Sequence, residues 1–326
     1  MSRDLNLKMK NKQKKIADLK NGHARVCGWL AASGAVFIAM GMGTNSACAH
    51  GFVGDYFFPP TVTTDDPFAT DELLLPSVSY FKSPAGGGSP AVGTTDVGFS
   101  FTKEIFPRFA LSISGDYLFQ KPDGQKLLTG WDDFAVNAKY ELWQNDAHQA
   151  IFSIGGEWDI GGSGSKQVGA DSTSTFEPIL YAGKAFGDLP DSLKYAKPMA
   201  VTGTLGVDLP TNADPNNLNW GIALEYSLPY LQEQVKDIGL PRPFRNIIPL
   251  VEFSMSSPLN RGGGVTTGTI NPGILYEAKY FQIGAEALIP VNSASGHEVG
   301  AIVQLQIYLD DIWPKAFGFP LIGHDK

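Results

Sequence analysis

Carboxylates placed on one side of alternating segments are the residues best suited to chemistry in this chain. Twelve of them lie opposite the apolar side of their segments: Asp96, Glu104, Asp116, Asp133, Glu141, Glu157, Asp159, Asp208, Glu225, Glu252, Glu277 and Glu286. Only Lys139 and Lys279 share that side. Carboxylates that line a confined, partly dry space focus negative potential, which concentrates cations and excludes anions. The pattern therefore predicts an acidic lining that favours cations, or neutral and aromatic solutes, over anions.

Segments with a period of two position these carboxylates. In the last segment, 298–309, one side carries Val299, Ala301, Val303, Leu305, Ile307 and Leu309, and the other carries Gly300, Gln304, Gln306 and Tyr308, with Ile302 as the exception. Successive side chains of a strand point to opposite faces, so this segment is a strand with one apolar face.

Similar segments recur at about 73–82, 94–105, 108–119, 131–143, 148–160, 175–186, 198–208, 217–228, 247–256, 269–279, 280–290 and 297–309. Only alternate residues of a barrel strand face lipid, so short alternating segments are long enough to span a membrane. An even number of strands returns both termini to the same side, as in single-chain bacterial barrels. The sequence therefore predicts an all-β fold, a transmembrane antiparallel β-barrel of about twelve strands.

The connections between these strands alternate between two kinds. Loops rich in Gly, Ser, Thr and Asn occupy 83–93, 121–130, 161–174, 209–216, 257–268 and 291–296, and we expect them to be extracellular. Tight links at 106–108, 144–147 and 279–280 and longer links at 187–197 and 229–246 are expected at the periplasmic end. Aromatic residues cluster near the strand ends, which is typical of rings at the two membrane interfaces.

The first 49 residues have the features of a cleaved signal peptide. A basic region is followed by an apolar run at 28–43 and by the small residues Ala47-Cys48-Ala49 before His50. This pattern predicts export and a location in the cell outer membrane of a Gram-negative bacterium, with Met9 as an alternative start. The sequence then divides into an irregular periplasmic or lumenal segment at 50–72, the barrel at 73–309 and a periplasmic tail at 310–326.

The chain after residue 49 is strongly acidic. It retains 17 of the 25 basic residues and 31 of the 33 acidic ones, a formal charge of −14. Such a surface repels nucleic acid. Both cysteines, Cys27 and Cys48, precede the predicted cleavage site, which excludes disulfides and Cys-based sites from the mature protein. The expected partners are outer-membrane lipids, the barrel assembly machinery and a small-molecule solute, and no cofactor is expected.

Two stretches resemble the phenol-degradation meta-pathway family of outer-membrane proteins. They are GAIVQLQIYLDDIWP at 300–314, followed by FGFPLIG at 317–323, and the mature start with FFPP at 57–60 and DDPF at 65–68. The resemblance implies an outer-membrane barrel with a transport role, often for apolar or aromatic compounds. It carries over no catalytic or binding residue. The chain continues to Lys326 instead of ending in an aromatic residue, so an assembly signal is expected near Tyr308 or Trp313.

Three functions follow as alternatives. The first is a channel or transporter for a small solute. The second is a structural or partner-binding barrel, in which Arg and Lys from the loops or the amino-terminal segment pair with the inward carboxylates. The third is a lipid-active enzyme, but Gly-x-Ser-x-Gly is absent, and His148 and His297 are expected at opposite barrel ends. We therefore predict no enzyme. His50 could offer copper an amine and an imidazole, yet no metal site is predicted.

Overall fold

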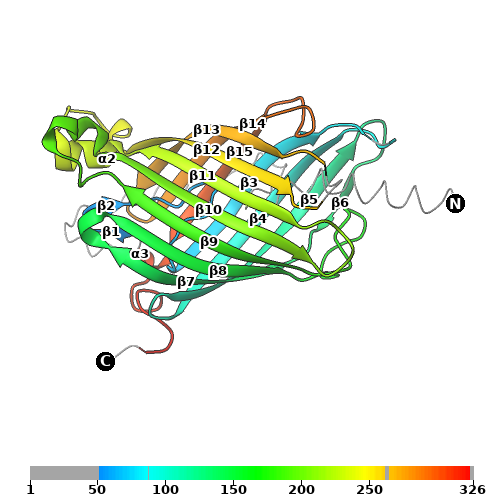
Figure 1. Cartoon of the computed structure of the whole chain (residues 1–326), viewed down its shortest axis with the longest axis horizontal. Coiled ribbons are helices and arrows are strands. Elements are labelled where there is room, and N and C mark those ends of the chain that lie inside the picture. Colours follow the sequence, from blue (N-terminus) through cyan, green and yellow to red (C-terminus); the bar gives the residue numbers. More distant parts are fainter. Residues whose placement is uncertain (1–50, 87, 261–263, 324–326) are drawn as a thin grey trace.

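Twelve strands form a closed antiparallel barrel, which confirms the predicted fold (Figure 1). The computed structural model describes residues 51–86, 88–260 and 264–323. The barrel strands are β3 (Glu72–Ser83), β4 (Val92–Phe106), β5 (Phe109–Pro122), β7 (Ala135–Asn145), β8 (Ala150–Asp159), β9 (Thr175–Ala185), β10 (Met199–Pro210), β11 (Asn217–Tyr226), β12 (Ile247–Pro258), β13 (Thr267–Ala278), β14 (Phe281–Pro290) and β15 (Gly300–Tyr308). Each pairs with its neighbour in sequence, and β15 pairs with β3 to close the sheet.

The barrel is apolar outside and polar inside. Exposed strand residues include Leu111, Ile113, Ile154, Leu180, Leu205, Ile222, Leu224, Ile274, Ile283 and Val303. Buried strand residues include Asn137, Ser153, Thr202, Asn271, Gln282, Gln304 and Gln306. A closed sheet satisfies its backbone hydrogen bonds without water, so an apolar outer face suits it to lipid. The predicted transmembrane barrel is therefore confirmed by both the pairing and the burial.

Large aromatic side chains stand on the outer face near both barrel ends. Phe106, Tyr140, Trp143 and Tyr280 are exposed near the end with the short turns, and Tyr80, Trp131, Trp158 and Phe176 are exposed near the end with the long loops. Amphipathic rings are favoured at the two membrane–water interfaces, where one side is apolar and the other is wet. The two groups therefore mark the upper and lower limits of the lipid-facing band.

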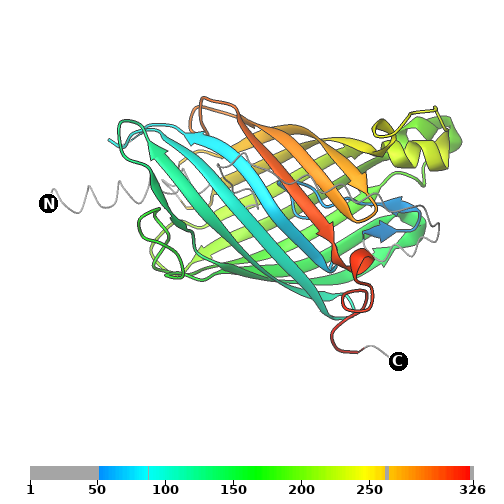
Figure 2. The same cartoon turned by 180° about the vertical axis from the view of Figure 1, so that it is seen from behind.

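The short helices gather at the end with the turns (Figures 1 and 2). They are η1 (Asp146–His148), η2 (Asp191–Ala196), α2 (Leu228–Tyr230), η3 (Leu231–Val235), η4 (Phe244–Asn246) and α3 (Leu309–Ile312). No helix within the described ranges is long and apolar enough to cross a membrane. The short β6 (Leu128–Trp131) extends from β5 at the opposite end, and a small hairpin of β1 (Phe52–Val53) and β2 (Tyr56–Phe57) precedes the barrel.

The carboxyl-terminal tail packs against the turn end of the barrel, and it is described up to residue 323. The predicted signal peptide at 1–49 and His50 lie outside the described residues. After α3, the tail returns to the barrel, where the backbone N–H of Leu321 and that of Ile322 donate to the carbonyls of Glu104 and Ile105 at 3.1 and 2.8 Å. The tail therefore covers the last residues of β4 at the turn end.

A charge on the outer face should destabilise the barrel in lipid. Ile222 lies in the middle of β11 and is exposed on the outer face. Arginine near the middle of the lipid-facing band of a barrel costs about 2–4 kcal/mol. We therefore expect Ile222→Arg to lower the free energy of unfolding in vesicles by that amount, measured by guanidinium titration. An unchanged midpoint would contradict this orientation of β11.

Candidate functional site in the barrel lumen

Residues 58–71, which we name the plug, enter the lumen from the turn end. Phe58 and Phe68 belong to a buried cluster with Ile151, Ala185 and Ala200 of the barrel wall. Farther along, Val62 packs in a second buried cluster with Ile248, Leu250, Leu275, Leu288 and Ile302. The plug therefore fills part of the lumen. The irregular segment 50–72 was expected either at the periplasmic end or in the lumen, and the structure places most of it in the lumen.

Glu252 in β12 is the central anchor of the plug. Its Oε1 accepts the Val62 N–H at 2.6 Å, and its Oε2 accepts the N–H of Thr63 at 3.0 Å and that of Thr64 at 2.5 Å. Thr63 Oγ1 also donates to Oε2 at 2.8 Å and accepts from Asn271 Nδ2 at 2.8 Å. The Glu252 carboxylate is fully buried. The two oxygens of this one side chain therefore fix three consecutive residues of the plug.

Side chains from several other strands hold the plug along its length. Gln282 Nε2 donates to the Pro60 carbonyl at 2.6 Å, and Gln304 Nε2 donates to the Thr61 carbonyl at 3.1 Å. Near the far end of the plug, the Ala69 N–H donates to Glu141 Oε1 at 2.8 Å. Since these partners lie on β14, β15 and β7, the plug is tied to opposite parts of the wall.

Two lysines of the wall pair with acids of the plug. Lys139 Nζ lies 2.9 Å from Asp65 Oδ2, donates to the Asp66 carbonyl at 2.7 Å and stands 4.6 Å from the centre of the Tyr181 ring. Lys103 pairs with Asp71 at 2.5 Å, close to the turn end. The amino-terminal segment thus supplies carboxylates to wall cations, whereas the structural alternative expected it to supply cations to wall carboxylates.

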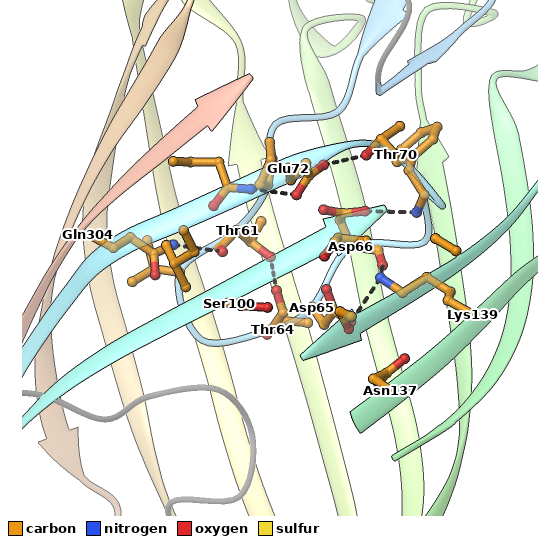
Figure 3. A pocket seen from close by; sticks show the side chains of 18 residues that line it. Thr61, Thr64, Asp65, Asp66, Thr70, Glu72, Ser100, Asn137, Lys139 and Gln304 are labelled. Carbon is orange, nitrogen blue, oxygen red and sulfur yellow. Dashed lines mark hydrogen bonds and ion pairs between the residues drawn. The ribbon is translucent and has the colours of Figure 1, made fainter. Parts of the chain in front are cut away.

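A polar cavity remains between the plug and the wall formed by β3, β4, β5, β7 and β15 (Figure 3). Its volume is about 90 Å³. The plug contributes Thr61, Thr64, Asp65, Asp66 and Thr70, and the wall contributes Glu72, Ser100, Thr102, Ser112, Asn137, Lys139, Gln304 and Gln306. Pro60, Val62, Phe68, Leu74 and Ala110 complete the lining, so the cavity offers hydroxyl, amide and carboxyl groups beside apolar surface and can hold water or a small polar solute.

Asp66 is the titratable group of the plug that the cavity environment perturbs most clearly. Burial raises the pKa of the Asp66 carboxyl to about 6. The neighbouring Asp65 and Glu141 add to the rise, whereas Lys139 opposes it. Burial also raises the pKa of Asp71. Charged forms are disfavoured where solvation is lost and like charges are close. At neutral pH, the ionised Asp66 carboxylate therefore lowers the stability of the docked plug.

This pKa rise predicts that acid tightens the plug. Asp66 faces Asp65, Glu141, Lys139 and Glu72, and a released plug would return its carboxyl to an ordinary value near 3.8. The docked form then binds a proton more readily between about pH 6 and pH 4, so docking gains up to about 3 kcal/mol as the pH falls through that window. We expect K⁺ conductance to fall between pH 7 and pH 5 in planar bilayers. Asp66→Asn should flatten this step, and a conductance that rises with acid would refute it.

Eleven of the predicted acids fall into two groups by burial. Asp96, Asp116, Glu157, Asp208, Glu225, Glu252 and Glu286 are buried strand residues and therefore point inward. Glu104, Glu141, Asp159 and Glu277 are partly buried. Glu141 reaches the plug, and Glu277 accepts the Tyr308 hydroxyl at 2.9 Å. The structure brings Glu252, Glu141 and Lys139 to the plug, so only part of the predicted set meets at one site.

Two predicted positions differ from their expected role. Asp133 lies between β6 and β7, where its carboxylate accepts the N–H of Gly164 at 2.8 Å and that of Asp171 at 2.6 Å and so organises the long loop. Lys279 is exposed in the turn between β13 and β14, with Nζ 5.1 Å from the centre of the Tyr280 ring. Alternation ends where the strand ends, and Lys279 therefore lies at the rim instead of in the lumen.

Sequence reasoning missed the acids of the plug, and the acid at the start of β3, as site residues. Asp65 and Asp66 of the plug and Glu72 of β3 line the cavity, although the sequence at 50–72 shows no strand period. The acidic pairs at 65–66 and 71–72 were the available signal, but composition alone cannot place an irregular segment inside a barrel.

The histidines occupy separate places. His148 Nδ1 lies 3.1 Å from Asp188 Oδ2 at the turn end, and His297 is exposed in the loop before β15. Within the described part of the chain, no three His, Cys, Asp or Glu residues are grouped so as to hold a metal ion. The positions of both histidines agree with those expected from the strand pattern.

Comparison with known proteins gives likeness only at the level of overall shape. No family model and no curated protein matches the chain. Among solved structures, the KdgM porin covers 72% of this chain and 98% of its own, with 11% identity and a TM-score of 0.43. The COG4313 outer membrane channel from Pseudomonas putida F1 covers 73% and 95%, with 10% identity and a TM-score of 0.49. LpxR from Salmonella typhimurium covers 73% and 99%, with 7% identity and a TM-score of 0.41.

At these identities and TM-scores, the likeness carries no argument about activity or substrate. The chain is similar to these barrels in outline, and its own strand pairing together with its apolar outer face establishes it as a closed twelve-stranded membrane β-barrel.

Proposed function

We propose that this protein is an outer-membrane channel for small solutes whose passage is narrowed by its own plug. The observation that carries the proposal is the cavity that remains beside the plug. Hydrogen bonds to wall side chains and two apolar clusters hold the plug, yet they leave a space whose lining includes hydroxyl, amide and carboxyl groups.

The charge of the lining supports a preference for cations and neutral solutes. Seven of the predicted acids are buried and point inward, whereas Lys139 is the inward member of the predicted lysine pair. Fixed carboxylates with few compensating cations concentrate cations. The resemblance to the phenol-degradation meta-pathway family would add neutral aromatic compounds as cargo. We further infer export by the predicted signal peptide and insertion by the barrel assembly machinery.

Single-channel recording in planar bilayers tests this proposal. We expect small conductance steps and, in a KCl gradient, a reversal potential on the cation side. Anion selectivity would overturn the charge preference. The experiment should include a plug-released variant, because a silent wild type could simply be closed. If neither the wild type nor the plug-released variant conducts, although heat-modifiable migration in gels shows both to be folded, the channel proposal is wrong.

The second candidate is a structural or partner-binding barrel. The number of plug contacts favours it, since Glu252 alone receives hydrogen bonds from three backbone N–H groups. A lipid-active enzyme is a third possibility, which release of fatty acid from phospholipid vesicles by the purified protein would reveal.

A further inference from the structure

The cavity beside the plug is lined by a buried acceptor that remains for a guest. Gln304 Nε2 is used by the Thr61 carbonyl, while Gln304 Oε1 is buried and has no hydrogen-bond partner among the described residues. The whole Gln304 side chain is nine-tenths buried or more, since the residue is 3% exposed. A buried amide oxygen without a donor costs free energy, which a guest carrying an N–H group would recover.

The charged groups around the cavity point the same way. Asp66 is 5% exposed and uses Oδ1 to accept the Phe68 N–H at 2.7 Å, and Asp66, Asp65 and Glu72 all line the cavity (Figure 3). Two nitrogen donors of the wall are already engaged: Lys139 by Asp65 and by the Asp66 carbonyl, and Gln306 by Glu72. Three acidic side chains thus line the cavity beside one ammonium group, and the Gln304 amide oxygen is an acceptor that no described residue uses.

Resting on the proposed channel function, we propose that this cavity is a binding station for a small organic cation that carries N–H donors, such as a primary alkylammonium ion. The ammonium group donates to Gln304 Oε1 and lies in the field of Asp66 and Glu72. A cavity of about 90 Å³ limits the guest to a few heavy atoms. A quaternary ammonium has the charge but no donor, and a polyol has donors but no charge, so neither satisfies both features of the lining.

Binding to the purified full-length mature protein in detergent tests this assignment without requiring conduction. We expect ethylammonium chloride to bind with one site per chain in isothermal titration calorimetry at pH 7.5. Tetramethylammonium, potassium and ethylene glycol should bind at least tenfold more weakly. Equal binding of potassium would show a site for inorganic cations and would overturn the proposal, as would the absence of ethylammonium binding.

Two matched variants locate the site. Asp66→Asn keeps an acceptor for the Phe68 N–H but removes the charge, and we expect ethylammonium affinity to fall at least tenfold. Asp208→Asn removes the same charge from a lumenal carboxylate outside the cavity, whose oxygens accept from Asn217 and Asn219, and should leave affinity unchanged. Equal losses in both variants would assign the binding to the general field of the lumen. The discrimination among ligands by the wild type stands even if a variant fails to fold.

The binding and conduction measurements separate the two proposals. If the barrel binds ethylammonium but conducts in neither plugged nor plug-released form, the binding proposal holds and the channel proposal is wrong. If it shows cation-selective conductance without binding ethylammonium, the channel proposal holds and the binding proposal is wrong.

Discussion

Glu252→Gln should open the barrel. The glutamine retains one acceptor oxygen, but its NH₂ group must face N–H donors of Val62, Thr63 or Thr64 in either orientation of the amide. A buried donor left without a partner costs about 1–3 kcal/mol, so two such donors weaken docking by about 3 kcal/mol, a factor of roughly 100. We expect single-channel conductance to rise at least threefold and protease to cleave within residues 58–71.

Asp208→Asn is the control for Glu252→Gln. It also removes one lumenal negative charge, but its carboxylate accepts from two asparagines of the neighbouring strand, Asn217 and Asn219. This variant should keep a protected plug and should not show the threefold rise in conductance. Should Glu252→Gln conduct like the wild type with its plug intact, the anchoring role of Glu252 would be wrong.

Lys139→Met should loosen the other side of the plug. The ammonium group is largely buried and holds both the Asp65 carboxylate and the Asp66 carbonyl. Removing one partner of a buried pair leaves an uncompensated charge, and the partial exposure of Asp65 limits the cost to about 3 kcal/mol or less. We expect faster proteolysis of the plug, more frequent open events and stronger cation selectivity, because the lumen gains one net negative charge.

Lys279→Met is the control for Lys139→Met. Lys279→Met removes the same charge from the exposed turn, beside the Tyr280 ring. We expect Lys279→Met to match the wild type in proteolysis and selectivity. We expect Lys139→Arg, which keeps the positive charge, to retain most of the wild-type protection and selectivity. If the two methionine variants shift selectivity equally, long-range charge and not the buried pair explains the result.

The strands could be predicted because period-two alternation is a local property. The expected segment at 217–228 is β11 (Asn217–Tyr226), and the expected strand at 247–256 is β12 (Ile247–Pro258). One prediction was wrong at a strand end: Lys279 continues the alternation in the sequence, but in the structure it lies in a turn. A strand's faces follow from its own residues once one face is in lipid, whereas its last residue depends on the partner strand.

The barrel, its number of strands and inward acids such as Glu252 could be predicted from residue patterns alone, because lipid outside and water inside sort side chains by polarity. What those acids bind became visible in the folded protein. Ile302 breaks the pattern of its strand because it packs with Val62 of the plug, and Glu252 binds backbone N–H groups about 190 residues away in sequence. An irregular segment has no period, so its place is set by partners that meet it only when the barrel closes.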